Sequence, residues 1–327
     1  MSGGLATALV TDGAGLEALA PEWWELWGRC PAATPFQSPA WIVPWWQVFA
    51  PGRLCTVAVR EGDTLVGLAS IYLEEGALGR RLLPLGIGIT DYLDVLLDPA
   101  VPGAAAALVG AVRELAPDWE RWELEELMPG AAAFDLQVPP GATEELANQS
   151  ACPVLALSGT DPIPSRKRRK LRMAENRVAR RDGAVARVTE DLPSFLDDLV
   201  RLHGARWATR GEDGVLADDP VRRFHAAALP RLVEAGLAHL TTLTIEGQVV
   251  GAYYGLQDAR RAYAYLGGFD PAFSFESPGT VLVGHAIEAA RQAGASEFHF
   301  LRGQEAYKYE WGAADRANRR RSFRRHG

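Results

Sequence analysis

The chain has 327 residues, which is ample for two domains of ordinary size, each with its own core. Hydrophobic residues make up 48% and charged residues 23%, a composition that excludes a disordered or a membrane-embedded chain. The formal net charge is −7, but residues 165–181 hold nine Lys/Arg and one acid (+8) and residues 316–327 hold six and none (+6), so the remainder carries −21. Two basic segments on an acidic body can bind phosphates, or can lie across acidic surface such as Glu123, Glu125 and Glu126.

No segment has the features of a membrane span, a secretion signal or a metal site. The longest apolar run, residues 100–112, is interrupted by a proline and a glycine and is too short to cross a bilayer. The N-terminus lacks the basic region and the cleavage pattern of a signal peptide, so a cytoplasmic protein is expected. Cys30, Cys55 and Cys152 are odd in number and far apart, which suits buried thiols better than disulfides or zinc ligands.

The first strongly patterned helix follows a turn at residues 34–39. Trp41, Trp45 and Phe49 recur there every four residues and form one helical face. This stripe is expected to be buried, with a substrate wall as the alternative. Beyond it, a period of two predicts strands, followed by one helix to about residue 115 and a last strand. The strands are expected at residues 54–59, 65–73, 81–85, 92–97 and 122–127.

The second half of the chain repeats this order of elements. Residues 59–73 match residues 244–256, with one residue more in the first turn, and strand, helix and strand follow in both cases. A long-period duplication of this kind predicts two copies of one α/β unit. Pro-, Gly- and Ala-rich segments place the seam between the copies, so the expected domains are residues 1–157 and 158–327. The first copy ends without a lysine or tyrosine and is expected to be a scaffold that also lines the substrate cleft.

The first basic segment is predicted to form an amphipathic helix. Leu171, Ala174 and Val178 mark its narrow apolar face, and Gly183 follows its last turn.

Two more helices are predicted, at residues 196–207 and 277–292. The first carries His203, and since a lone helical histidine is more often structural than catalytic, it receives no catalytic role. In the second, Ser277 is a good N-cap and Pro278 suits the first helical position. No serine nucleophile elbow, metal-ligand cluster or P-loop occurs in the sequence.

The C-terminal part of the chain holds the main candidate for a site. Residues 297–300 alternate as a strand, and a polar loop around Arg302 follows. Behind the loop, Lys308 stands between two tyrosines. Two interpretations stay open from the residues alone: the lysine stem packs along Tyr307 and Trp311, or its ammonium takes part in chemistry.

The pattern FxFLRGxExYKYxWG in this segment resembles the C-terminal signature of the CelD-like acetyltransferases, a family named after a cellulose-biosynthesis protein and part of the GNAT superfamily. That family is related to the Fem peptidoglycan aminoacyltransferases, whose FK-containing segment is similar to Tyr307-Lys308. Residues 34–46, residues 91–96 and the pair Arg206-Trp207 resemble the same family. The resemblance implies an α/β fold of two tandem duplicated GNAT domains in a Fem-like arrangement, with the acyl donor in the splay between two strands.

The resemblance also implies roles for individual residues. In Fem relatives the corresponding lysine contacts the reacting acyl ester, so Lys308 is expected to donate to the oxygen on which negative charge develops. Glu305 or a water would take the proton, and Tyr307 completes the catalytic set. The cofactor-binding residues would be Ser277, Gly279, Thr280 and Arg302, because backbone N–H groups at a helix start can bind the pyrophosphate of coenzyme A. The acceptor-binding residues would be Asp91, Tyr92, Asp94, Arg168, Arg206 and Trp207, with solvated loop carboxylates as the alternative for the two aspartates.

These roles describe an acyltransferase that uses acyl-coenzyme A, with acetyl-coenzyme A as the expected donor. The acceptor would be an amine or hydroxyl of a sugar or peptide-like molecule, such as a precursor of the cell envelope or of an exopolysaccharide. One alternative is an aminoacyl-tRNA-dependent transferase of the Fem type, which the two basic segments favour. Another is an inactive GNAT duplicate that binds nucleic acid through residues 166–181. No metal is expected in any of the three.

Overall fold

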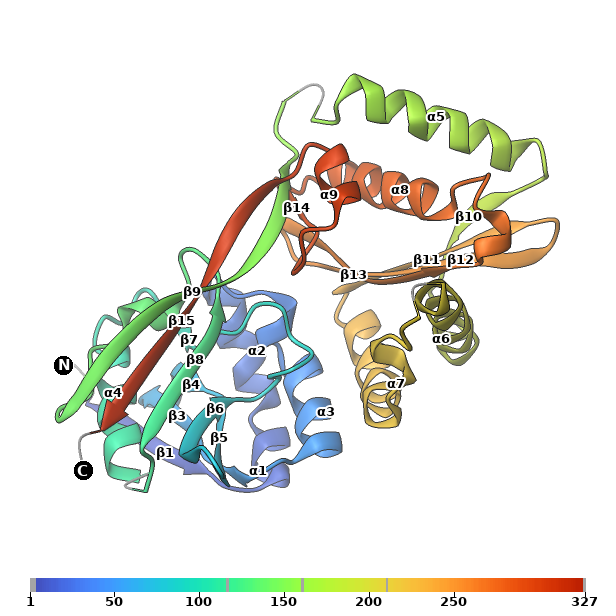
Figure 1. Cartoon of the computed structure of the whole chain (residues 1–327). Helices are drawn as coiled ribbons and strands as arrows, with labels where there is room; N and C mark the ends of the chain where they lie inside the picture. The colour runs from blue at the N-terminus through green and yellow to red at the C-terminus, as the bar shows by residue number, and fades with distance from the viewer. Residues whose placement is uncertain (1–3, 116–117, 160–161, 210, 326–327) are drawn as a thin grey trace. The chain divides into compact units, whose positions relative to one another are not determined.

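The computed structural model describes residues 4–115, 118–159, 162–209 and 211–325. The chain divides into two compact units, each a mixture of helices and sheets (Figure 1). Unit 1 comprises Met1–Ser150 and Ala317–Gly327, and unit 2 comprises Ala151–Arg316. Each unit has a hydrophobic core of its own. Among the described residues, no helix has the length and apolar character needed to cross a membrane.

Unit 1 begins with a strand and helices, continues with a hairpin-rich sheet and closes with a helix and a strand. Its elements are β1 (Leu5–Val10), α1 (Gly13–Ala18), α2 (Ala20–Arg29), η1 (Pro35–Gln37), α3 (Pro39–Phe49), β2 (Arg53–Leu54), β3 (Thr56–Glu61), β4 (Thr64–Ala69), β5 (Ile71–Gly76), β6 (Gly79–Pro84), β7 (Leu96–Leu97), α4 (Ala104–Leu115), β8 (Arg121–Leu127) and η2 (Ala132–Asp135). Strands β9 (Ala142–Ala156) and β15 (Ala314–Arg325) each have residues in both units.

Unit 2 holds the basic helix, two further helices, a hairpin and the C-terminal helix and strand. Its elements are α5 (Ser165–Ala179), β10 (Ala184–Arg187), α6 (Leu192–Ala208), η3 (Val215–Ala217), α7 (Asp219–Glu234), β11 (Ala238–Ile245), β12 (Gln248–Gln257), β13 (Arg261–Phe269), η4 (Pro271–Phe273), α8 (Pro278–Gln292), β14 (Glu297–His299) and α9 (Ala306–Glu310). The helices predicted around Trp41, in the first basic segment and at residues 196–207 and 277–292 are confirmed as α3, α5, α6 and α8.

The two units repeat one order of elements. In each, a first strand (β1 or β10) pairs antiparallel with the first strand of a hairpin (β3–β4 or β11–β12) after the intervening helices. In each, a crossover helix (α4 or α8) then joins two parallel strands, β6 to β8 or β13 to β14. The predicted α/β duplication is therefore confirmed in the topology.

The two hairpins agree even in an irregularity of their pairing. In the first hairpin, Val59 pairs with Gly67 and Arg60 with Leu65, which leaves Val66 as a bulge. In the second, Leu243 pairs with Gly251 and Thr244 with Val249, which leaves Val250 as a bulge. Both turns have two residues, Gly62-Asp63 and Glu246-Gly247. The extra residue expected in the first turn is therefore absent. When the hairpins are aligned by their strand pairing, Glu61-Gly62 and Glu246-Gly247 are offset by one position, and the bulges with the glycines that follow them, Val66-Gly67 and Val250-Gly251, are equivalent.

In each unit, the second strand of the parallel pair also pairs with a strand from a distant part of the chain. β8 pairs antiparallel with β15, and β14 pairs antiparallel with the last residues of β9. The basic C-terminal tail, expected to belong to the second half, lies with unit 1 instead: residues 317–325 belong to that unit, and β15 pairs with β8.

The strand predicted at residues 92–97 is wrong over most of its length, since only Leu96–Leu97 pair in a sheet. The Asp94 side chain turns the segment into a loop by accepting hydrogen bonds from the backbone N–H groups of Ala132 and Ala133, both at 2.8 Å. A carboxylate that caps another segment in this way competes with strand pairing.

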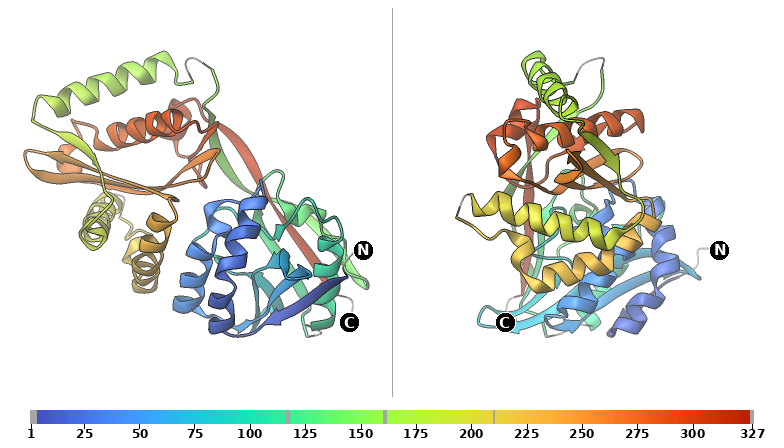
Figure 2. Two further views of the ribbon diagram at one scale, coloured as in Figure 1. Left: turned by 180° about the vertical axis from the view of Figure 1, so that it is seen from behind. Right: turned by 90° about the vertical axis from the view of Figure 1, so that its right-hand side faces the viewer.

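In unit 2 the sheet is covered on both sides. Figures 1 and 2 show α5 and α8 on one side and α6 and α7 on the other. Helix α6 lies very close to β13 at Gly268, where an alanine Cβ would be 2.3 Å from the backbone nitrogen of His203. A side chain at this glycine would therefore push the helix off the sheet.

Strands β13 and β14 run together only briefly. They pair over Arg261–Tyr263 and Glu297–His299, three positions, and Tyr265 then forms a bulge against β12. Among the described residues, positions 264–269 have no strand partner on the β14 side. The two strands thus diverge, as the resemblance implied.

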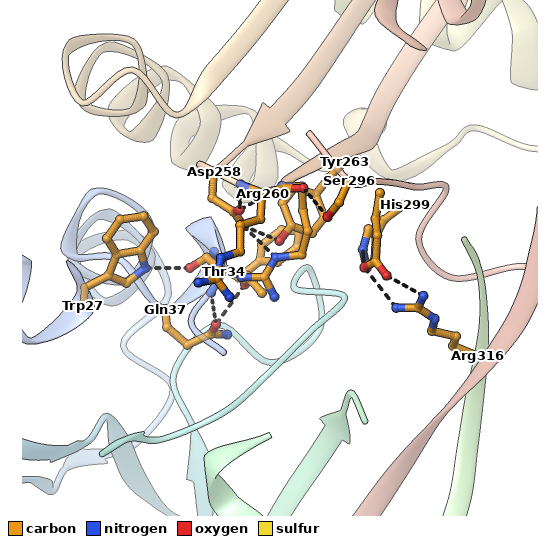
Figure 3. A network of polar contacts seen from close by, with 12 residues as sticks. Trp27, Thr34, Gln37, Asp258, Arg260, Tyr263, Ser296, His299 and Arg316 are labelled. Carbon is orange, nitrogen blue, oxygen red and sulfur yellow. Dashed lines mark hydrogen bonds and ion pairs between the residues drawn. The ribbon is translucent and has the colours of Figure 1, made fainter. Parts of the chain in front are cut away.

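A partly buried polar network fixes the closed end of this splay (Figure 3). The Tyr263 hydroxyl donates to Asp258 Oδ2 at 2.6 Å, and its ring lies 5.0 Å from that of His299. His299 Nε2 and Arg316 Nη1 both lie 3.0 Å from Glu297 Oε2. The hydrogen bonds from His299 and Arg316 lower the pKa of Glu297 to about 2. Glu297 is therefore a carboxylate that the native state holds in its charged form.

We expect Gly268→Ala to lower the free energy of unfolding by about 1 to 3 kcal/mol, because a clash with backbone cannot be relieved by rotating a side chain. Gly267→Ala is the matched control, since its Cβ would meet only Ala252 O at 3.5 Å. Urea denaturation, monitored by tryptophan fluorescence, measures the free energy of unfolding of both variants. Equal stability of the two variants would contradict the close packing of α6 on β13.

We expect the carboxylate of Glu297 to stabilise the fold above pH 4.5 and to lose this contribution as the pH falls from about 4.5 to about 2, because its folded-state pKa is lowered. Solvent screens this partly exposed group, so Glu297→Gln should cost about 1 to 2 kcal/mol at pH 7 and flatten the acid limb of the stability curve. Glu288→Gln, at an exposed pair with Arg291, is the control. An unchanged acid limb in Glu297→Gln would refute the assignment.

Candidate active site

The open end of the splay is lined by β13 and by a charged side chain from α6. The Gly267 carbonyl of β13 accepts from Arg206 Nη1 at 3.3 Å and from His203 Nδ1 at 3.4 Å. The Arg206 guanidinium also lies 5.5 Å from the centre of the Phe269 ring. Arg206, predicted as a substrate-binding residue, is thus placed on the free edge of β13.

The N-terminus of α8 follows directly after this edge. Ser277 has the N-cap position, but it is in the left-handed region (φ 57°) and its side chain makes no capping bond. Its hydroxyl lies 3.4 Å from the Ser274 carbonyl oxygen instead. The expected serine cap is therefore wrong, and among the described residues the N–H of Gly279 has no acceptor. A Cβ at Gly279 would touch the Phe269 ring at 3.4 Å, so the predicted cofactor-binding residues Ser277, Gly279 and Thr280 lie beside the β13 edge.

Lys308 is buried, with 3% of its surface exposed, and its ammonium is surrounded by oxygen atoms. Nζ lies 3.3, 2.6 and 3.0 Å from the carbonyl oxygens of Leu301, Arg302 and Gly303, and 2.9 Å from Glu305 Oε2. An ammonium has three protons, so these four acceptors engage all of them. Lys308 therefore binds the polar loop to α9.

The loop has a backbone that needs such support. Leu301 has φ 60° although it is not a glycine, and Gly303 has φ 102°. A left-handed leucine costs about 1 to 2 kcal/mol, which the bonds to the ammonium and the burial of the leucine side chain offset. Arg302, predicted as cofactor-binding, is part of this loop and is partly exposed.

Tyr307 and Trp311, expected to pack along the stem of Lys308, contact other residues. Tyr307 packs edge-on against Phe300 with ring centres 6.3 Å apart, and it is Lys167 whose Nζ lies over the Trp311 ring, at 4.4 Å. The sequence left two interpretations of Lys308 open, packing or chemistry. The structure adds a third, in which the ammonium holds a loop.

Glu305 connects the loop with the edge of β13. Its side chain is 40% exposed. Burial raises the pKa of this carboxyl, but the hydrogen bond and charge of Lys308, with the charge of Arg206, outweigh it and hold the pKa below the usual range. Glu305 is therefore ionised at neutral pH. Gly279, Phe269, Arg206, Glu305 and Lys308 form one chain of neighbours.

Other predicted residues in unit 2 lie elsewhere. Trp207 packs beside His203 under Gly214, with ring centres 5.8 Å apart, and burial lowers the pKa of His203 to about 4, so this imidazole is neutral. Arg168 belongs to α5 and lines a cavity of about 500 Å³ between α5, α8 and β10. This cavity is on the opposite side of the sheet from α6, so the structure does not bring Arg168 to Arg206.

The three acceptor-binding candidates of unit 1 have structural partners. Tyr92 is buried with its ring 6.3 Å from that of Phe36, and the Asp91 carbonyl accepts from Asn318 Nδ2 at 3.2 Å. Burial raises the pKa of Asp94 to about 7, although three backbone N–H groups donate to its carboxylate. Asp94 therefore accepts hydrogen bonds from the backbone of η2 within unit 1.

Sequence reasoning missed Gly267 and the network of Asp258, Tyr263, Glu297 and His299. The available signal was the alternation of Arg261 with Tyr263 and of Glu297 with His299, polar pairs on two strands that are otherwise apolar. Among the described residues, no group of three or more His, Cys, Asp or Glu side chains could hold a metal ion.

Comparisons with known proteins agree with this geometry. Residues 165–309 match the family model described as Acetyltransferase (GNAT) domain. None of the curated proteins compared with the chain matches it.

Solved structures match over nearly the whole length. FemX is 12% identical with a TM-score of 0.70, over 97% of this chain and 96% of its own. The C-terminal domain of a putative lysylphosphatidylglycerol synthetase from Agrobacterium fabrum is 13% identical with a TM-score of 0.61, over 95% and 92%. L-PGS from Bacillus licheniformis is 14% identical with a TM-score of 0.59, over 96% and 92%. Residues 165–309 thus form a GNAT acetyltransferase domain, and the chain is a transferase whose α/β fold is that of FemX.

Proposed function

We propose that the chain transfers an acyl group, in the first place acetyl, from acyl-coenzyme A to an amine or hydroxyl of a sugar or peptide-like acceptor in the cytoplasm, as a CelD-like acetyltransferase. One juxtaposition carries the proposal. Among the described residues, the β13 edge without a strand partner beyond Tyr263 lies beside an N-terminus of α8 that has no side-chain cap. Both features would serve an extended ligand with a phosphate at one end.

The donor would be held by backbone groups of unit 2. Its amide-bearing pantetheine arm can pair with the free edge of β13, as a peptide does in strand addition. Its pyrophosphate can accept from the Gly279 N–H at the positive end of α8. Arg206 and Arg302 supply positive charge nearby.

The acceptor would meet an ionised carboxylate. In the transfer, the acceptor nitrogen or oxygen attacks the thioester carbonyl, the C–S bond breaks and coenzyme A leaves as a thiolate, which takes up the proton that the acceptor loses. Glu305 attracts a cationic amine and can take its proton, directly or through water. Lys308 supports this arrangement by holding the loop that carries Glu305.

The solved structures suggest where the acceptor belongs. FemX and the C-terminal domain of a putative lysylphosphatidylglycerol synthetase share the fold, and the name of the latter refers to a membrane lipid. By analogy of fold, we propose a precursor of the cell envelope or of an exopolysaccharide as the acceptor.

A second candidate is transfer from aminoacyl-tRNA to a peptidoglycan precursor. The arginines of α5 favour it, since RNA binding depends on such charges. An inactive duplicate that binds nucleic acid is the third candidate, and it would show RNA affinity without turnover.

We expect acetyl-coenzyme A to bind with an affinity that changes modestly between 50 and 200 mM salt, whereas a tRNA-dependent enzyme should lose roughly 10³-fold or more in tRNA affinity. Gly279→Asp should weaken acetyl-coenzyme A at least roughly 10-fold while leaving helix stability unharmed, because an acid at a helix start repels phosphate but suits the helix dipole. Gly279→Asn is the neutral control. Calorimetric titration measures both ligands. Tight tRNA binding without acetyl-coenzyme A binding would favour the second or third candidate.

We expect Lys308→Met to lower the free energy of unfolding by about 1 to 3 kcal/mol, because it leaves loop carbonyls without a donor. Glu305→Gln should keep the fold, since the carbonyl bonds of Lys308 remain, and should lower turnover by roughly 10²-fold or more if Glu305 takes the proton. Thermal melting and release of free coenzyme A thiol separate the two effects. A Lys308→Met protein that is stable but inactive would restore the direct role for the ammonium, and normal turnover of Glu305→Gln would remove Glu305 from the mechanism.

A further inference from the structure

We propose that the outward face of α5 docks the protein on an anionic lipid surface. This face consists of Arg166, Arg169, Arg172 and Met173 of the helix and of Arg180 at its C-cap, all of them exposed. In Figures 1 and 2, α5 is the outermost layer of unit 2 on its side of the sheet, beyond α8.

The position of the arginines follows from how the helix is buried. Lys167, Ala174 and Val178 are buried, and Leu171 packs on Gly284 of α8. At 3.6 residues per turn these positions share one side, so the five residues of the outward face lie on the other. Fifteen residues make a straight face about 22 Å long.

The charges of this face are not neutralised by the protein. Lys167 and Lys170 pair with Glu310, and Arg181 pairs with Glu246 and Glu276. Within the described part of the chain, none of the four arginines of the outward face has an acidic partner. These four charges are therefore available to an external anion.

The second basic segment behaves differently. Arg316, Arg320 and Arg321 pair with Glu297, Glu145 and Glu144. Glu123 and Glu126 accept from Ser322 and Asn318 of the same strand. Three of the six arginines of this segment thus have acidic partners. The net charge of −7 includes +8 from residues 165–181, so the rest of the chain carries −15 and on balance repels an anionic partner. Such a protein approaches an anionic surface with α5 first.

Two exposed apolar side chains favour lipid over RNA. Met173 is 49% exposed in the middle of the outward face. Phe275 is 67% exposed next to the helix, where Arg177 covers its ring at 4.2 Å and donates to its carbonyl at 2.7 Å. At a bilayer interface, methionine and phenylalanine side chains can enter the apolar region while the neighbouring arginine side chains extend to the lipid phosphates. Methionine has neither an aromatic ring on which a nucleotide base could stack nor a hydrogen bond to offer it.

The test is co-sedimentation of the full chain with vesicles of phosphatidylcholine, with and without phosphatidylglycerol. The wild type should bind only the anionic vesicles. Combined Arg166→Gln, Arg169→Gln and Arg172→Gln should weaken this binding roughly 10²-fold, at about tenfold or less for each arginine. Combined Met173→Ser and Phe275→Ser should weaken vesicle binding and leave binding to heparin, an anion without an apolar phase, unchanged.

The matched control removes three exposed arginines elsewhere, by Arg187→Gln, Arg260→Gln and Arg319→Gln. It changes the net charge equally and should keep vesicle binding. An equal loss in the control, or no binding of the wild type to anionic vesicles, would overturn the proposal. If the α5 variant lost affinity for tRNA and kept its affinity for vesicles, the face would be an RNA surface instead. None of these outcomes depends on acyl transfer.

Discussion

The three-residue parallel pairing of β13 with β14 is the constraint on which unit 2 depends. Tyr263 and His299 are its last paired positions, and beyond them β13 has no strand partner on this side among the described residues. Backbone groups that lack a partner in the protein must bond to something else, water or ligand. Everything assigned to the candidate site lies around this opening: the Gly267 carbonyl, Arg206, Phe269 and the start of α8.

A splay of this kind stays open only if both of its sides are rigid. On one side, α6 contacts β13 at Gly268 with no room for a Cβ. On the other, Lys308 gathers three consecutive carbonyls of the loop after β14, including that of left-handed Leu301. A buried ammonium with four oxygen partners supports a loop better than exposed ion pairs do, because removing it leaves buried acceptors unsatisfied.

The duplication allows corresponding positions of the two units to be compared. Both units have the hairpin with its Val-Gly bulge, the crossover helix and a parallel strand pair. In unit 1, however, the corresponding loop after β8 contains no lysine, and Asp94 and Tyr92 are engaged in η2 and in an aromatic contact. The same scaffold therefore engages Asp94 and Tyr92 in contacts within unit 1 and, in unit 2, carries the residues of the proposed site.

The sequence by itself predicted the helices α3, α4, α5, α6 and α8, the hairpins and their duplication, and it proposed the segment around Lys308 as a site, because periodicity and turn residues are local properties. It could not determine which atoms meet. Leu301 gives no sign of its positive φ, since leucine disfavours that conformation, and Arg206 reaches a carbonyl 61 positions away. The two basic segments look alike in sequence, yet half of the arginines of one have glutamate partners because it pairs in a sheet, whereas the other forms an outer helix. Such differences arise from the packing of distant segments, which only the tertiary structure decides.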